Sequence, residues 1–352
     1  MGWRNPPVPW SELERTLSDA GPVAPTVAPP GDGSDAPAWS RKRSPYAPPT
    51  LVRGRSGVPY AELHCHSQFS FLDGASPPEA LVEEAVRLGL GALALTDHDG
   101  LYGVVRFAEA ARAVGLPTVF GAELTLGRTV PPVGEPDPGA HRSESHLVVL
   151  ARDPRGYALL SRAISEAQLR GEKGAPRASL AGLGALGGLD APVADRGHWL
   201  VLTGCRKGAV ATALEEHGPA AAADQLARLV DAFGREHVAV ELWDHGHPLD
   251  SVRNDALAQI ALRAGVDPVA TTNAHYATPA QRPLATALAA VRARRSLDDI
   301  DGWLPAGAGA HLRSGAEQSR RFARTPGVVE RAAELGAQCA FDLSLVAPSL
   351  PP

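Results

Sequence analysis

The feature that most limits how this chain can fold is an alternation of short apolar runs with helical segments, which begins at Tyr60. Runs such as 147–150 and 199–202 contain no polar residue, which is typical of strands buried on both faces. Strands are predicted over 60–65, 91–96, 117–126, 146–151, 199–204, 237–243 and 267–273. Helices are predicted over 77–88, 101–114, 154–169, 219–233, 250–264 and 279–294. This alternation predicts an α/β fold.

Seven strands in one continuous series favour a distorted seven-stranded β/α barrel of the TIM-like kind over an open sheet. Functional groups then collect at the carboxyl ends of the strands. One link breaks the pattern, because the Pro- and Gly-rich stretch 127–139 cannot form a helix. A link without a helix suits an antiparallel strand at 146–151. His146, at the start of that strand, would then lie on the same rim as the ends of the other strands.

The chain divides into three parts by composition. Residues 1–58 predict a mostly disordered Pro/Gly-rich tail with one short helix over 10–17. Residues 59–295 predict the barrel. Residues 296–352 predict an irregular segment, a last helix over 327–338, and a proline-rich linker toward a further domain.

Charge and cysteine content narrow the classes of function. A formal net charge of -5 argues against a free-standing nucleic-acid binder. Three widely spaced cysteines argue against a disulfide framework. The amino terminus has no signal-peptide core and no run reaches the length of a membrane span. We therefore expect a cytoplasmic location and no membrane partner.

Histidine, carboxylate and thiol side chains recur where the predicted strands end. His64 and His66 close the first strand and, being two residues apart, point to the same face. The other groups at this rim are Asp73, Asp97, His98, Glu123, His146, Cys205, Asn273 and His275. Imidazole, carboxylate and thiolate are ligands for Zn²⁺, Mn²⁺ or Fe. They are too many for one tetrahedral ion, so a cluster of two or three ions is indicated.

Several of these residues also have ordinary structural interpretations. Cys205 alone is more often a small buried apolar residue, and Cys65 is predicted to lie in the core. Asp97 can orient a ligand without binding metal, and Asp99 can cap the helix that follows it. His245 and the neighbouring His247 end the sixth strand, where a rim or substrate role is favoured over metal binding.

The ordered motifs resemble the PHP (polymerase and histidinol phosphatase) domain. They are His64-Cys-His66, Leu72-Asp-Gly74, Thr96-Asp-His98, Gly121-Ala-Glu123, His146-Leu-Val-Val-Leu-Ala151, Thr203-Gly-Cys205 and Asn273-Ala-His-Tyr276. Three further phrases, 5–10, 94–103 and 301–305, are similar to the amino-terminal region of bacterial error-prone DNA polymerases, C-family relatives of the polymerase III alpha subunit. The resemblance covers essentially the whole chain.

The resemblance implies a nine-ligand site for two or three divalent ions, Zn, Mn, Fe or Mg. Carried over by motif, the ligands are His64, His66, Asp73, His98, Glu123, His146, Cys205, Asn273 and His275. The family usually has Asp where this chain has Asn273. An amide oxygen binds a metal without contributing charge, so one ion should be held more weakly. Asp97, Asp99 and His245 are expected to contact ligands or substrate.

The implied function is a metal-dependent phosphoesterase or 3′–5′ exonuclease in DNA repair and translesion replication. Its partners would be DNA or another phosphoester, the remainder of a polymerase, and translesion accessory proteins. Two alternatives stay open: a non-catalytic PHP scaffold for a polymerase, and a stand-alone PHP phosphatase. Polymerisation by this chain alone is not expected, because its 352 residues contain no recognisable palm carboxylates, fingers or OB-fold.

Overall fold

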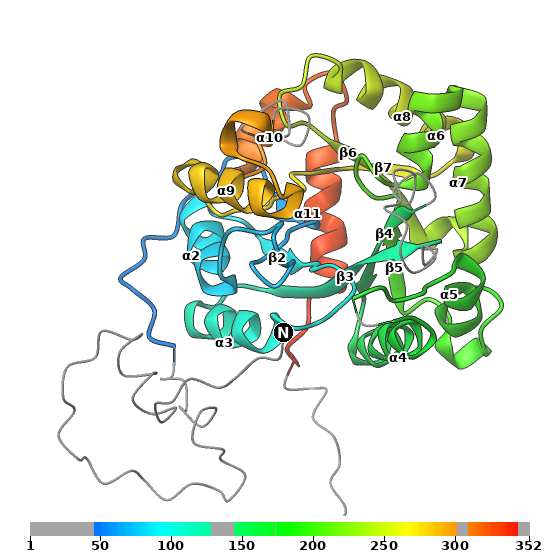
Figure 1. Cartoon of the computed structure of the whole chain (residues 1–352), viewed down its shortest axis with the longest axis horizontal. Coiled ribbons are helices and arrows are strands. Elements are labelled where there is room, and N and C mark those ends of the chain that lie inside the picture. Colours follow the sequence, from blue (N-terminus) through cyan, green and yellow to red (C-terminus); the bar gives the residue numbers. More distant parts are fainter. Residues whose placement is uncertain (1–45, 128–143, 173, 301–308, 344–352) are drawn as a thin grey trace, which may run out of the picture. The chain divides into compact units, whose positions relative to one another are not determined.

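The computed structural model describes residues 46–127, 144–172, 174–300 and 309–343. Seven strands follow one another in chain order across a single sheet (Figure 1). They are β1 (Ala61–Glu62), β2 (Ala92–Leu95), β3 (Thr118–Leu126), β4 (Ser145–Ala151), β5 (Trp199–Leu202), β6 (Val238–Trp243) and β7 (Asp267–Thr271). Six of the seven lie inside the predicted ranges, and β4 begins one residue before its predicted range, at Ser145. The agreement is close because the apolar runs are a strong local signal.

The first and last strands meet beyond their regular ends. The amide of His66 donates to the carbonyl of Ala274 at 2.7 Å, and the amide of Ala274 donates to the carbonyl of His64 at 3.0 Å. This parallel bridge brings the two edges of the sheet together and makes a nearly closed barrel. The predicted α/β barrel is therefore confirmed.

Strand β4 runs against its neighbours. It is antiparallel to both β3 and β5, whereas all other neighbouring strands are parallel. His146 lies opposite Thr125, near the carboxyl end of β3. The predicted reversal is confirmed, and it places His146 on the same rim as the ends of the parallel strands. The Pro-rich link that motivated it falls largely at 128–143, outside the described residues.

Helices surround the strands. They are α2 (Pro78–Leu88), α3 (Val104–Val114), α4 (Pro154–Arg170), α5 (Leu180–Gly187), α6 (Ala209–His217), α7 (Pro219–Phe233), α8 (Asp250–Ala264), α9 (Arg282–Ala293), α10 (Gly315–Arg321) and α11 (Val328–Cys339). In Figure 1, α2 and α3 lie on one side and α4 to α8 on the other. Gly89, Gly115 and Gly265 end α2, α3 and α8 in the left-handed conformation. The short α5, α6 and α10 were not predicted.

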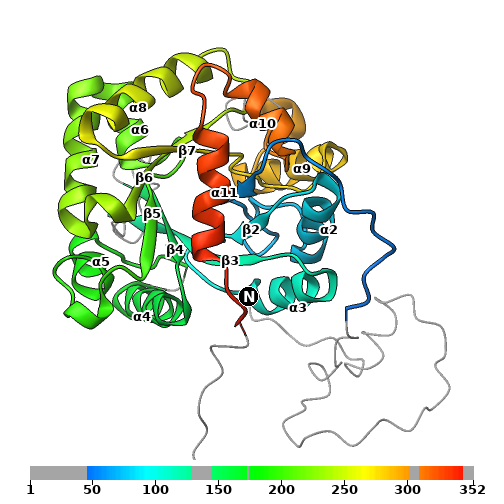
Figure 2. The ribbon, with the colours of Figure 1, turned by 180° about the vertical axis from the view of Figure 1, so that it is seen from behind.

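Helix α11 covers the amino-terminal end of the barrel (Figure 2). A Cβ on Gly336 would lie 2.5 Å from the Cβ of Ala61, the first residue of β1. The amide of Phe341, just after the helix, donates to the carbonyl of Thr118, the first residue of β3, at 3.1 Å. Arg331 pairs with Asp267, the first residue of β7. The predicted ligands lie at the opposite, carboxyl-terminal rim of the barrel.

Most of the predicted tail over 1–58, including the short helix at 10–17, lies outside the described residues. Residues 46–58 contain no helix or strand and lie against α2: Tyr46 donates to Glu83 at 2.8 Å, and the amide of Gly54 donates to the carbonyl of Val86 at 3.0 Å. The predicted linker falls largely at 344–352, also outside. No helix of the described part has the length and apolar character to span a bilayer.

Candidate metal centre

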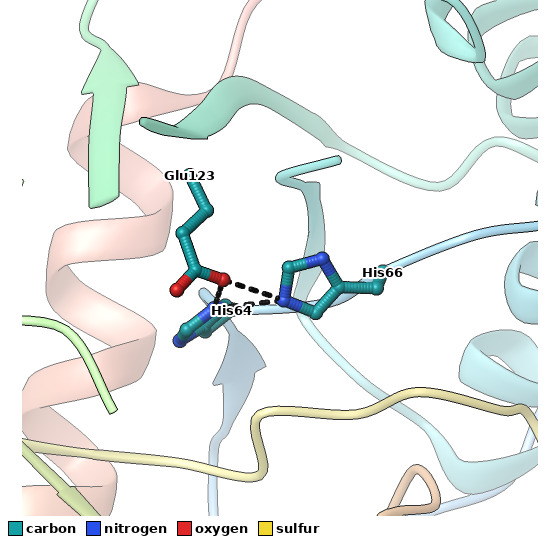
Figure 3. A group of neighbouring side chains, drawn as sticks. All are labelled: His64, His66 and Glu123. Carbon is teal, nitrogen blue, oxygen red and sulfur yellow. Dashed lines mark hydrogen bonds and ion pairs between the residues drawn. The ribbon is translucent and has the colours of Figure 1, made fainter. Parts of the chain in front are cut away.

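Three side chains converge at the mouth of the barrel. The Nε2 atoms of His64 and His66 are 3.0 Å apart, and Oε2 of Glu123 lies 3.0 Å from the first and 2.9 Å from the second. Figure 3 shows the two rings and the carboxylate pointing toward one another. All three are essentially buried. Donor atoms that share one metal ion at about 2.1 Å lie about 3.0–3.4 Å apart, so this triangle fits one coordination sphere.

The backbone explains why these side chains meet. His64 and His66 follow β1 in extended conformation, so both point to the inside of the barrel. Glu123 lies in the middle of β3, and its amide donates to the carbonyl of Asp97 at 3.2 Å. His98 therefore pairs with Glu123 as β2 continues past its regular end.

Glu123 also takes part in a second group. Its Oε1 contacts Nδ1 of His146, and its Oε2 lies 3.7 Å from Nδ1 of His98. His98, Glu123 and His146 form a second potential metal-binding set. The thiol of Cys205 lies 3.9 Å from Oε1 of Glu123. Oε1 thus faces His146 and Cys205, while Oε2 faces His64, His66 and, at a longer distance, His98, so one carboxylate contacts both groups, as a ligand that bridges two ions does.

A third group lies nearer the surface. Oδ2 of Asp73 is 2.9 Å from Nε2 of His98 and 3.3 Å from Nδ1 of His275. Oδ1 of Asp73 pairs with the guanidinium of Arg292 on α9. His98 links this outer group to the buried one, since its ring stacks on that of His66 with centroids 4.5 Å apart.

Asn273 lies at the same rim in an unusual conformation. Its φ is +48°, and only 5% of its surface is exposed. Its Oδ1 is buried and has no hydrogen-bond partner among the described residues. An orphaned buried acceptor is costly and rare, and a cation is one way to satisfy it. This oxygen fits a role as a neutral ligand.

Sequence reasoning missed Glu241, the acidic residue of β6. Its side chain is fully buried, and Oε1 lies 2.6 Å from Nδ1 of His64. The hydroxyl of Thr271 donates to the same oxygen at 2.5 Å. A carboxylate can only accept, so Nδ1 of His64 carries a proton, and Nε2 is the ring atom left to bind an ion beside Glu123. The one available signal was an acidic residue inside an otherwise apolar strand.

Asp97 plays the corresponding part for His66. Its carboxylate accepts hydrogen bonds from the Ser67 amide at 2.7 Å, the Ser67 hydroxyl at 2.8 Å and the Ser70 hydroxyl at 2.8 Å. Because Ser70 donates to Asp97, its oxygen must accept from Nδ1 of His66, 3.1 Å away. Nε2 of His66 is then the free donor atom. Asp97 therefore orients the ring of His66 through Ser70.

Asp99 and His245 contact residues that neighbour the predicted ligands in sequence. Asp99 does not cap the following helix; its carboxylate accepts from the amide and hydroxyl of Thr125 at 2.7 and 2.8 Å. His245 donates through Nε2 to the carbonyl of Thr272 at 2.7 Å, next to Asn273. His247 is exposed, and Cys65 is fully buried in the core.

Burial and mutual charge set the protonation of the cluster. Burial would raise the pKa of Glu123, but His146, His98 and His64 hold it well below its usual range. Burial, helped by the charge of His98, lowers the pKa of His66 and keeps its imidazole neutral. Burial, with the charge of Glu123, raises the pKa of Cys205 to about 12, so an ion would have to displace the thiol proton. An ionised carboxylate and neutral imidazoles are the forms that bind divalent metals.

The chain matches known proteins over its whole length. The PHP domain family matches residues 62–245, more than half of the chain. The chain is 56% identical over 353 residues to the error-prone DNA polymerase of Mycobacterium bovis and 50% identical over 396 residues to that of Nocardia farcinica. All of this chain is covered, but only 31% and 34% of those proteins, so it spans about a third of the length of these curated relatives.

Solved structures give looser likenesses. A Bifidobacterium adolescentis crystal structure, provisionally assigned as a metal-dependent phosphoesterase, aligns with a TM-score of 0.42 and 17% identity, covering 78% of this chain and 99% of that one. A Chromobacterium violaceum amidohydrolase aligns with a TM-score of 0.41 and 19% identity, covering 62% and 88%. The extent of the family match and the identity to the polymerases confirm the resemblance, and the chain belongs to the PHP domain family.

Proposed function

We propose that this PHP domain binds two or three divalent ions and hydrolyses phosphoesters with them. The ligands would be His64, His66, Asp73, His98, Glu123, His146, Cys205, Asn273 and His275. The observation that carries the proposal is the position of Glu123, which belongs to both potential metal-binding sets: its Oε2 faces His64 and His66, and its Oε1 faces His146. Zn, Mn, Fe and Mg are all candidates for the ions.

Some of the residues would bind the ions, and others orient the histidines that bind them. His64, His66 and Glu123 would hold a buried ion, and His98, Glu123, His146 and Cys205 a second one. Asp73, Asn273 and His275 would supply the exposed side of the cluster. Glu241 and Asp97 fix the tautomers of His64 and His66, so that both present Nε2 to the centre. Bound divalent ions would supply Lewis acidity and charge stabilisation for attack on phosphorus.

The named relatives suggest the setting in which the site works. They are error-prone DNA polymerases, of which this chain matches about a third. We therefore propose DNA as the phosphoester, a 3′–5′ exonuclease as the form of the activity, and repair or translesion replication as the process. The rest of a polymerase and its translesion accessory proteins would be the partners, in the cytoplasm.

Metal content tests the proposal. The 352-residue chain is purified without chelator, loaded with Mn²⁺ or Zn²⁺, desalted, and measured by inductively coupled plasma mass spectrometry. We expect about two equivalents or more in the wild type and a loss of more than one in Glu123→Gln. Glu84→Gln serves as the control, because Glu84 is also buried but pairs with Arg87 on α2. Less than one equivalent in the wild type would reject the proposal.

A scaffold without catalytic activity is the second candidate, and Asn273 favours it. An amide in place of a carboxylate leaves the exposed side of the site one negative charge poorer. Hydrolysis of single-stranded DNA separates the two candidates. Activity in the metal-loaded wild type that disappears in His66→Ala would exclude the scaffold, whereas equal background rates in both would support it.

A further inference from the structure

Arg292 lies in the last turn of α9, at the edge of the candidate centre. Its guanidinium pairs with Oδ1 of Asp73, while Oδ2 of the same carboxylate faces His98 and His275. One carboxylate group therefore separates Arg292 from two imidazoles of the site. The arginine side chain is 39% exposed, so it faces the solvent from which a substrate would arrive.

Most of the hydrogen-bonding capacity of Arg292 is unused. A guanidinium has five N–H donors in a planar fork. Within the described ranges, the contact with Asp73 is the only hydrogen bond that it makes. By comparison, Arg253 on α8 uses both terminal nitrogens of its guanidinium, one toward Asp250 and one toward the carbonyl of Trp243, and its guanidinium lies over the Trp243 ring at 3.7 Å. Arg292 keeps several donors free at the mouth of the site.

Helix α9 is fixed in place by the loops that carry the ligands. Ala285 and Leu288 on the helix pack against a small buried cluster of Ala75, Tyr276 and Ala310. Ala75 lies two residues after Asp73, and Tyr276 follows His275. The helix therefore bridges the two loops that supply the outer ligands. Arg292 is presented to the centre by this packing and does not rely on its own ion pair alone.

The neutral side chain of Asn273 suggests a role for a guanidinium with free donors at this site. Asn273 contributes no charge where a carboxylate would help to hold an ion, and its Oδ1 has no partner in the described part of the chain. A protein cation paired with Asp73 can supply positive charge at the site that does not depend on metal occupancy. A guanidinium fork matches two oxygens of a phosphate group, and arginine is preferred for this bidentate contact.

We propose that Arg292 binds the phosphate group of the substrate, with Asp73 positioning its guanidinium beside the ions. The inference rests on the proposed phosphoesterase function and adds a phosphate-binding residue that is not a metal ligand. Transition-state charge on phosphorus is commonly stabilised by such arginine contacts. The competing view is that Arg292 only neutralises Asp73. The two views predict opposite changes in phosphate affinity when Arg292 is removed. An arginine that only neutralises Asp73 competes with the metal for this carboxylate, so its removal would strengthen metal binding and, with it, phosphate binding.

The test measures phosphate affinity and metal content on the same samples. The full 352-residue chain is loaded with Mn²⁺, desalted, and titrated with inorganic phosphate by calorimetry. The variants are Arg292→Met and Arg292→Lys. Arg324→Met is the matched control, since Arg324 also forms an exposed ion pair, with Asp255, on residues that are not predicted ligands. Metal content is read by mass spectrometry before each titration.

We expect Arg292→Met to keep at least the wild-type metal content and to bind phosphate about tenfold more weakly. Arg292→Lys should fall between it and the wild type, and Arg324→Met should match the wild type. Unchanged or tighter phosphate binding by Arg292→Met would overturn the inference, as would a loss of metal in that variant or a lysine no better than methionine. Failure of the proposed function looks different, because the wild type itself would then take up no metal.

Discussion

Removing the negative charge of Glu241 should weaken metal binding, although Glu241 is not a proposed ligand. Both side chains of the His64–Glu241 pair are fully buried and 2.6 Å apart. Loss of a carboxylate that orients a metal-binding histidine typically costs about 10- to 100-fold in affinity. Glu241→Gln keeps an acceptor for His64 and Thr271, so we expect about a tenfold loss. Glu241→Ala leaves both donors buried and unpaired, so we expect about a hundredfold loss.

The loss of metal affinity in Glu241→Gln should depend on pH in a defined direction. Burial lowers the pKa of His64, but Glu241 and Glu123 together raise it well above its usual range. A proton on Nε2 competes with metal, so the wild type loses affinity as the pH falls. Glu241→Gln removes part of that upward shift. Its deficit relative to the wild type should therefore be largest near pH 8 and smaller near pH 6.

A competition titration against a fluorescent chelator measures these affinities. Far-ultraviolet circular dichroism checks that each variant is folded, and Glu84→Gln reports the effect of removing a buried carboxylate elsewhere. Folded Glu241→Gln and Glu241→Ala proteins that bind metal within about twofold of the wild type at pH 8 would refute the reasoning. So would a deficit that grows as the pH falls.

Three further outcomes follow from the structure. Gly336→Ala should destabilise the fold by about 1–3 kcal/mol in urea unfolding, although alanine normally favours helices, because the added Cβ meets that of Ala61; Gly57→Ala, with open space around it, should be near neutral. Burial and the charge of His275 lower the pKa of His245 to about 4 from an ordinary value of about 6.5. As the pH falls, the unfolded chain therefore takes up this proton before the folded one does. The free energy of unfolding of the metal-free protein should fall by up to about 2 kcal/mol between pH 7.5 and 5, an upper value because the ring is partly exposed. His245→Gln should reduce this loss. Adding Mn²⁺ at a hundred times its dissociation constant should stabilise the wild type by about 2.7 kcal/mol in thermal unfolding, and EDTA should reverse it; an unchanged midpoint would contradict the metal site.

The barrel itself could be predicted because its signals are local. Apolar runs without polar interruption mark the buried strands, and the proline-rich link marks the reversal at β4. Asp97 was predicted to orient a neighbouring ligand, but Glu241 and Arg292 could not be predicted in the same way. Glu241 becomes informative only when barrel closure brings β6, the neighbour of β7, close to the end of β1, and Arg292 only when α9 packs over the loops near Asp73.

Short helices were missed for a different reason. Helix α10 is seven residues long, too short for an amphipathic period to show. Its capping signal was present, since the hydroxyl of Ser314 accepts from the amide of Glu317 at 3.3 Å. Helix α5 is rich in glycine, which lowers helix propensity. In both cases packing decided what the local sequence left open.

The position of α11 has a consequence for how the chain is made. The helix that covers the amino-terminal end of the barrel comes from 328–339, yet it packs on β1 at Ala61. During synthesis, the first strands leave the ribosome long before α11 has been synthesised. Contacts between residues so far apart in sequence slow folding and leave apolar surface open to aggregation in the meantime. A nascent chain stalled before 328 should therefore recruit chaperones that a chain synthesised past 339 no longer binds.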